Sequence, residues 1–165
     1  MKIQDKTTAL LGACVIAGNL ICASAQAHEA VTEESITSRY KMAAVSNRAR
    51  GNVVLAGNYQ RAIDALDGKS AKQFASSTNL CVAYTMTGEL QKADVECDAA
   101  LKLSEDKALH QDMAIALSNL GVLKAVSGDM NGAQQDFTRA LELNRKLSEA
   151  SENLQILREA HATGA

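Results

Sequence analysis

The sequence has no proline and no tryptophan, and only 3% of its 165 residues are aromatic. Without proline nothing in the backbone forces a helix to stop, so glycines and short polar runs must separate the elements. Scarce aromatic residues disfavour strands. The abundant Ala, Leu, Glu, Lys and Gln favour helices. We therefore predict an all-α protein.

A surplus of positive charge is also missing. The chain has 17 Lys and Arg against 19 Asp and Glu, which gives a net charge of −2. Proteins that bind nucleic acids neutralise phosphates with basic residues, so we expect no nucleic-acid partner. The length suits one domain, with a core large enough to be stable without disulfides or structural metal ions.

Residues 1–27 have the pattern of a secretory signal peptide. Lys2 and Lys6 form a short basic start, and small residues at Ala25 and Ala27 precede a cleavage point. We expect cleavage after Ala27 and an exported protein, which is periplasmic if the host is a Gram-negative bacterium and secreted otherwise.

Residues 1–27 admit two other interpretations, a membrane anchor and a lipoprotein. A membrane anchor is disfavoured because the apolar run over residues 8–22 is shorter than the roughly 20 residues of a span. A lipoprotein is disfavoured because the hydrophobic stretch ahead of Cys14, in the loose lipobox of residues 11–14, is only a few residues long. We expect no membrane span after cleavage.

After a polar tail at 28–37, the sequence predicts a helical repeat domain over residues 38–162. Short glycine turns separate the expected helices, and such turns make neighbouring helices antiparallel. Ser70 and Ser104 are suitable N-caps for two of them. The expected helices cover 38–56, 58–66, 70–87, 89–103, 105–127, 130–143 and 145–160. They form hairpins over 38–66, 70–103 and 105–143, followed by a cap at 145–160.

One pattern recurs at a spacing of forty residues. The matched pairs are Leu80 and Leu120, Gly88 and Gly128, Ala93 and Ala133, Ala100 and Ala140, and Leu101 and Leu141. A weaker copy begins at Gly57-Asn58-Tyr59, and Asn153-Leu154 repeats Asn119-Leu120 thirty-four residues on. A repeat of this length indicates stacked supersecondary units.

These residues resemble the tetratricopeptide repeat, a pair of helices of about 34 residues. That family has a Leu-Gly-x-x-Tyr segment on the first helix, a Gly-Asp or Gly-Asn turn, and Ala, Phe and Ala on the second. Leu120-Gly121, Gly128-Asp129, Ala133, Phe137 and Ala140 fit this pattern, whereas Lys124 stands where tyrosine is expected. The resemblance implies a short right-handed solenoid of about three repeats plus a C-terminal capping helix.

The same resemblance implies a concave groove lined by the first helix of each hairpin. Carried over by position, the groove residues are Thr78, Val82, Thr85, Ser118, Val122 and Ala125. These side chains are small and weakly polar, so an extended or helical protein segment is a better ligand than a C-terminal carboxylate. We therefore expect a non-catalytic interaction module or adaptor. The alternative is that these faces only coat a helical spacer.

Cys81 and Cys97 would be the only cysteines after signal cleavage. They lie seven residues before Gly88 and nine after it, so a hairpin folded at that glycine brings them to nearly the same height. Two outcomes are open at this point. The cysteines form a disulfide in an oxidising compartment, or they remain two reduced, buried small hydrophobes.

No catalytic or metal-binding constellation is found in the sequence. The histidines are His28, His110 and His161, and none lies within metal-ligand spacing of another. We expect no enzyme activity, no metal and no cofactor. Two other classes of function are alternatives. One is a small exported metal or redox carrier that uses His28 or Cys81 and Cys97, and the other is a self-associating structural protein.

Overall fold

The computed structural model describes residues 39–45, 54, 57–68, 73–105 and 109–163. Within them lie six helices and no strand, so this part of the chain is all-α as expected. The helices are α3 (Tyr59–Leu66), α4 (Phe74–Met86), α5 (Leu90–Glu105), α6 (His110–Val126), α7 (Met130–Leu143) and α8 (Ser148–Thr163). The expected signal peptide and polar tail lie outside the described residues.

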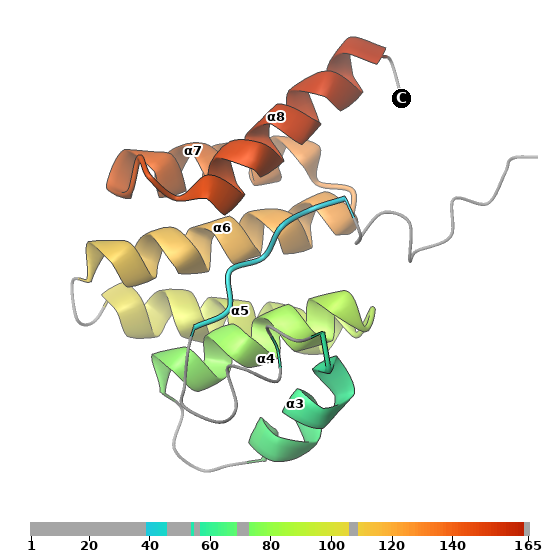
Figure 1. Cartoon of the computed structure of the whole chain (residues 1–165), viewed down its shortest axis with the longest axis vertical. Coiled ribbons are helices and arrows are strands. Elements are labelled where there is room, and N and C mark those ends of the chain that lie inside the picture. Colours follow the sequence, from blue (N-terminus) through green and yellow to red (C-terminus); the bar gives the residue numbers. More distant parts are fainter. Residues whose placement is uncertain (1–38, 46–53, 55–56, 69–72, 106–108, 164–165) are drawn as a thin grey trace, which may run out of the picture. The chain divides into compact units, whose positions relative to one another are not determined.

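The helices pack in the order of the chain. Each helix contacts the next one, from α3 through to α8. In addition, α4 contacts α6 and α6 contacts α8, so these three form one layer, as Figure 1 shows. None of the described helices is both long enough and apolar enough to cross a membrane.

Two turns of identical construction close α4 and α6. Gly88 and Gly128 have φ values of 78° and 91°, in the left-handed region that favours glycine. The N–H of Glu89 donates to the carbonyl of Tyr84 at 2.9 Å, and the N–H of Asp129 donates to that of Lys124 at 2.8 Å. This is the Schellman ending of a helix. The sequence repeat is therefore also a repeat of backbone geometry.

Several helix ends differ from those expected. α4 begins at Phe74, rather than at residue 70, and α6 begins at His110, rather than at residue 105. Ser104, expected to cap the next helix, lies inside α5, where its hydroxyl donates to the carbonyl of Leu101 at 2.6 Å. α7 has the expected bounds, and Asp129 caps it by accepting a hydrogen bond from the N–H of Gly132 at 2.9 Å.

The largest difference is at residues 39–45, which the sequence placed in a helix over 38–56. That prediction is wrong for these residues, because Arg39 and Tyr40 form a turn and a bend, and residues 41–45 cross the layer of α4, α6 and α8 without helical structure (Figure 1). We call residues 39–45 the N-terminal segment. The reason for its conformation is found in its contacts with the three helices.

Candidate functional site

Three asparagines, one on each helix of the layer, hold the main chain of the N-terminal segment. Each side-chain amide makes two hydrogen bonds to a single residue, accepting from its N–H and donating to its carbonyl. Asn153 bonds Lys41 at 2.8 and 2.7 Å, Asn119 bonds Ala43 at 2.8 Å twice, and Asn79 bonds Val45 at 3.0 Å twice. We call Asn79, Asn119 and Asn153 the asparagine ladder.

The geometry of an extended chain explains why alternate residues are bonded. Successive residues point their N–H and C=O groups to opposite edges, so Lys41, Ala43 and Val45 present theirs on the same edge. An asparagine side chain carries both a donor and an acceptor. Each amide therefore takes the place of one residue of a neighbouring strand. The segment runs from α8 to α4, opposite to the order of the helices.

Burial explains why the segment is extended. Asn79 and Asn153 are 0% exposed and Asn119 is 1% exposed. Buried polar groups are nearly always hydrogen-bonded, and an unpaired one costs roughly 1–3 kcal/mol. A helix over the segment would use its N–H and C=O groups internally. It would leave the asparagine ladder without these partners.

Apolar side chains also fix the segment. Tyr40 is 7% exposed and packs into a cluster formed by α6, α7 and α8. Ala43 is buried as well, whereas Lys41 is exposed. Val45 packs against a cluster that contains Phe74. The cluster around Tyr40 contains Val122, Ala125, Ala133, Phe137, Leu154 and Leu157.

The groove residues expected from the sequence are buried beside the ladder. Thr78, Val82 and Thr85 are on α4, and Ser118, Val122 and Ala125 are on α6. Val122 and Ala125 are in the cluster that contains Tyr40. The Thr85 hydroxyl instead donates to the carbonyl of Cys81 in its own helix, at 2.8 Å. Within the described part of the chain, the hydroxyls of Thr78 and Ser118 have no hydrogen-bond partner.

The asparagines themselves were not among the expected groove residues. A signal for them was present, because an asparagine precedes the leucine at Leu80, Leu120 and Leu154. A polar residue that recurs at one buried position of successive helices needs a hydrogen-bond partner at each of them.

A cleft of about 540 Å³ borders the N-terminal segment. Its walls come from the segment itself, from α3 and α4 on an apolar side, and from the start of α8 on a polar side. The lining residues are Tyr40, Lys41, Met42, Ala44, Val54, Tyr59, Val82, Met86, Ser148, Glu149 and Glu152. The segment therefore lies along an open space and is not enclosed by the helices.

Cys81 on α4 and Cys97 on α5 form a disulfide, with their Cα atoms 4.8 Å apart. Both residues are buried, at 1% and 0% exposure. Thiol–disulfide exchange needs access to the sulfur atoms, so this position suits a structural bond better than a redox carrier.

The corresponding position in the next hairpin, forty residues on, is filled differently. There Gly121 faces Phe137, and a Cβ added to Gly121 would lie 2.6 Å from Cε1 of the phenyl ring. The glycine thus makes room for the ring between α6 and α7. The disulfide between Cys81 and Cys97 replaces this glycine–phenylalanine contact between α4 and α5.

Lys124, where the repeat pattern has tyrosine, bonds a buried acid. Its ammonium lies 2.5 Å from Oδ2 of Asp136, which is 3% exposed, and Arg139 approaches the other oxygen at 3.8 Å. Burial raises the pKa of Asp98, and Asp94 adds to this while Lys124 opposes it. The lysine therefore offsets the negative charge on this side of the molecule.

Histidines and acids do not assemble a metal site in the residues that the structure describes, since no group of three or more is suitably placed. His110 is exposed at the start of α6. His28, proposed as a ligand in the carrier alternative, and the side chain of His161 lie outside the described residues.

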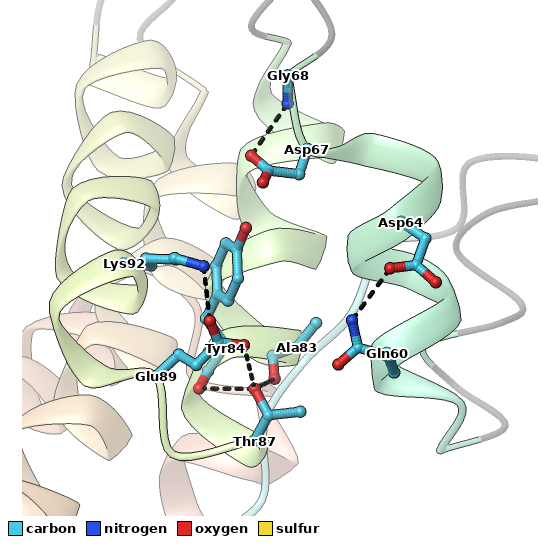
Figure 2. Close-up of polar contacts among 9 residues, drawn as sticks. All are labelled: Gln60, Asp64, Asp67, Gly68, Ala83, Tyr84, Thr87, Glu89 and Lys92. Carbon is cyan, nitrogen blue, oxygen red and sulfur yellow. Dashed lines mark hydrogen bonds and ion pairs between the residues drawn. The ribbon is translucent and has the colours of Figure 1, made fainter.

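Figure 2 shows the surroundings of Tyr84, which occupies the position equivalent to Lys124. The ammonium of Lys92 lies 5.2 Å from the ring centroid and pairs with Glu89 at 2.7 Å. Burial, aided by the carboxylates of Asp67 and Glu89, raises the pKa of Tyr84 to about 12 from its ordinary 10.0.

The raised pKa of Tyr84 predicts a loss of stability at high pH. The folded state favours the neutral phenol, so its contribution is complete below pH 10 and disappears as the pH rises through about 12. We expect the free energy of unfolding, measured with urea, to fall between pH 10.0 and about 12. The fall should be smaller in Tyr84→Phe, where the raised pKa values of Tyr40 and Lys92 remain. Equal falls in both proteins would contradict this assignment.

Comparison with protein-family models, with curated proteins and with solved structures finds no match for this chain.

Proposed function

We propose that this chain is an exported, non-catalytic adaptor of the tetratricopeptide-repeat type, which binds an extended polypeptide segment of a partner across α4, α6 and α8. The observation that carries the proposal is the asparagine ladder. Three buried amides, one per helical hairpin or cap, bond the main chain of an extended segment at alternate residues.

The packing order supports a short solenoid. Helices that contact their sequence neighbours, with α4, α6 and α8 in one layer, are the arrangement expected of stacked hairpins. In such an array the equivalent residues of each repeat form a row. Asn79, Asn119 and Asn153 occupy such a row, at the same position in three copies of the pattern.

Main-chain recognition determines what the site binds. Hydrogen bonds to N–H and C=O groups give affinity for an extended backbone of any sequence, and side-chain pockets add specificity. No covalent chemistry is needed, so the proposed activity is binding alone. Export is supported by the pattern of residues 1–27 and by the disulfide, which forms and persists in oxidising compartments.

The proposal is tested by selecting ligands without prior choice of sequence. A library of random peptides is displayed and panned on the protein purified after export, and in parallel on its Tyr40→Ser variant, in which the N-terminal segment has lost its buried aromatic side chain. Selected peptides are then synthesised with a single N-methyl group at each residue in turn. N-methylation removes one N–H donor and leaves the side chain unchanged.

We expect the affinity to fall about tenfold when the N-methyl group is on any of three alternate residues, the value of one lost hydrogen bond. Methylation of the two intervening residues should have a smaller effect, because their N–H groups point to the other edge. Binding through the asparagine ladder is refuted if no peptide is selected on either protein. It is also refuted if N-methylation lowers the affinity equally at the three alternate and the two intervening residues.

A further inference from the structure

We propose that the N-terminal segment is a resident occupant of the ligand site, and that the partner segment replacing it carries an aromatic residue three positions before a small one. This inference depends on the proposed function, since it names the ligand and the regulation of the same site. It starts from how the resident segment is held.

The bonds to the asparagine ladder involve no side chain of the segment. All six join a ladder amide to the N–H or C=O of Lys41, Ala43 or Val45. The backbone of another polypeptide in the same conformation presents identical groups. The ladder therefore cannot distinguish the resident segment from a partner, and the two must compete.

Two side chains of the segment define the preferred sequence. Tyr40 is 7% exposed in the apolar cluster of α6, α7 and α8, so this end of the site accepts an aromatic ring. Ala43 is also 7% exposed, beside Asn119, so a large side chain there would have to displace its surroundings. Lys41, between them, is exposed and selects nothing.

The segment is held in a way that permits exchange. Met42, Ala44 and Val45 are only partly buried, and the cleft of about 540 Å³ runs beside Tyr40, Met42 and Ala44. An incoming chain thus has a space next to the resident one. Its apparent affinity is the intrinsic affinity multiplied by the fraction of molecules in which the site is free.

The experiment uses the segment itself as the probe. A fluorescent peptide of sequence Arg-Tyr-Lys-Met-Ala-Ala-Val, identical to residues 39–45, is titrated with the exported protein and its anisotropy is measured. Two variants weaken the resident segment without changing any helix, Tyr40→Ser and Ala43→Trp. Lys41→Ala is the matched control, since it alters an exposed side chain of the same segment and leaves the main chain intact.

We expect the peptide to bind Tyr40→Ser and Ala43→Trp at least tenfold more tightly than it binds the unmodified protein or Lys41→Ala. Replacing the peptide's own tyrosine with serine, or its first alanine with tryptophan, should weaken binding to the Tyr40→Ser protein at least tenfold. An N-methyl group on that first alanine should do the same, whereas one on the second alanine should not.

Equal affinity of the peptide for all four proteins, or no binding to any of them, would overturn the resident-occupant proposal. If library peptides with the alternating N-methyl pattern still bind, the proposed function stands and only its regulation is refuted. If no library peptide binds either, the proposed function itself fails. Because Tyr40→Ser and Ala43→Trp alter the segment at different residues, a folding defect in one variant leaves the other as a test.

Discussion

Replacing Asn119 with leucine is expected to lower the free energy of unfolding by about 2–6 kcal/mol. The variant loses both bonds to Ala43 and leaves the N–H and C=O of that buried residue unpaired, at roughly 1–3 kcal/mol for each group. Leucine is close to asparagine in size, so the loss reflects hydrogen bonding more than a cavity. Urea unfolding measures the change.

The matched control for Asn119→Leu is Asn131→Leu. Asn131 is exposed on α7, and surface substitutions usually change stability by less than about 0.5 kcal/mol. Amide hydrogen exchange adds a local readout, because the N–H of Ala43 should lose its protection in Asn119→Leu alone. Equal stability of the two variants, with Ala43 still protected, would show that the ladder does not hold the segment.

Reducing the disulfide between Cys81 and Cys97 is expected to lower the free energy of unfolding by about 3 kcal/mol. The bond closes a loop with a sequence separation of 16, and the chain-entropy estimate for a loop of this size is about 3 kcal/mol. Urea unfolding of the exported protein with and without a phosphine reductant tests this, with free thiols counted before and after.

The contact between Gly121 and Phe137 in the neighbouring hairpin suggests a pair of control variants for this experiment. Cys81→Gly with Cys97→Phe copies the contact between Gly121 and Phe137, whereas Cys81→Ala with Cys97→Ala only removes the sulfur atoms. A buried phenylalanine contributes about 3–5 kcal/mol relative to alanine, and a helical glycine costs about 1. We expect the copied pair to be more stable than the alanine pair by about 2 kcal/mol, and neither to respond to the reductant. If the alanine pair is the more stable, the two positions are not equivalent.

Local signals in the sequence were sufficient for most of the helical framework. Gly88 and Gly128 end helices through left-handed turns because glycine has no Cβ to clash, and the residues after them start the next helix. The predicted bounds of α7, 130–143, agree with the structure, because the short turn at Gly128-Asp129 marks where this helix starts. Features determined by residues close in the sequence could thus be predicted.

The conformation of the N-terminal segment could not be predicted from local sequence, because it depends on tertiary contacts with residues far along the chain. Alanine, lysine and methionine favour helices, and propensity alone makes residues 39–45 helical. The deciding contacts come from Asn79, Asn119 and Asn153, which lie 34, 76 and 112 residues further along the chain. Tertiary bonds to buried amides outweigh a preference of a few tenths of a kcal/mol per residue.

The predicted groove residues and two of the three ladder asparagines lie on the same helices, α4 and α6. Thr78 and Val82 flank Asn79, and Ser118 and Val122 flank Asn119. The resemblance to a repeat family predicts a groove along these helices. It does not predict that residues 39–45 of the same chain bond Asn79, Asn119 and Asn153.

The bond between Lys41 and Asn153 has a consequence for the order of folding. Stacked helical hairpins make mainly local contacts, so they can form one after another and fray from their ends. The segment contacts both the first and the last helix of the layer. Its bond to Asn153 joins residues 112 apart in the sequence, and closing such a long loop has a large entropic cost. The segment is synthesised early, but it can bond Asn153 only after α8 has been synthesised. We therefore expect the N-terminal segment to dock as the final step of folding, and α4, α6 and α8 to unfold together once it has docked.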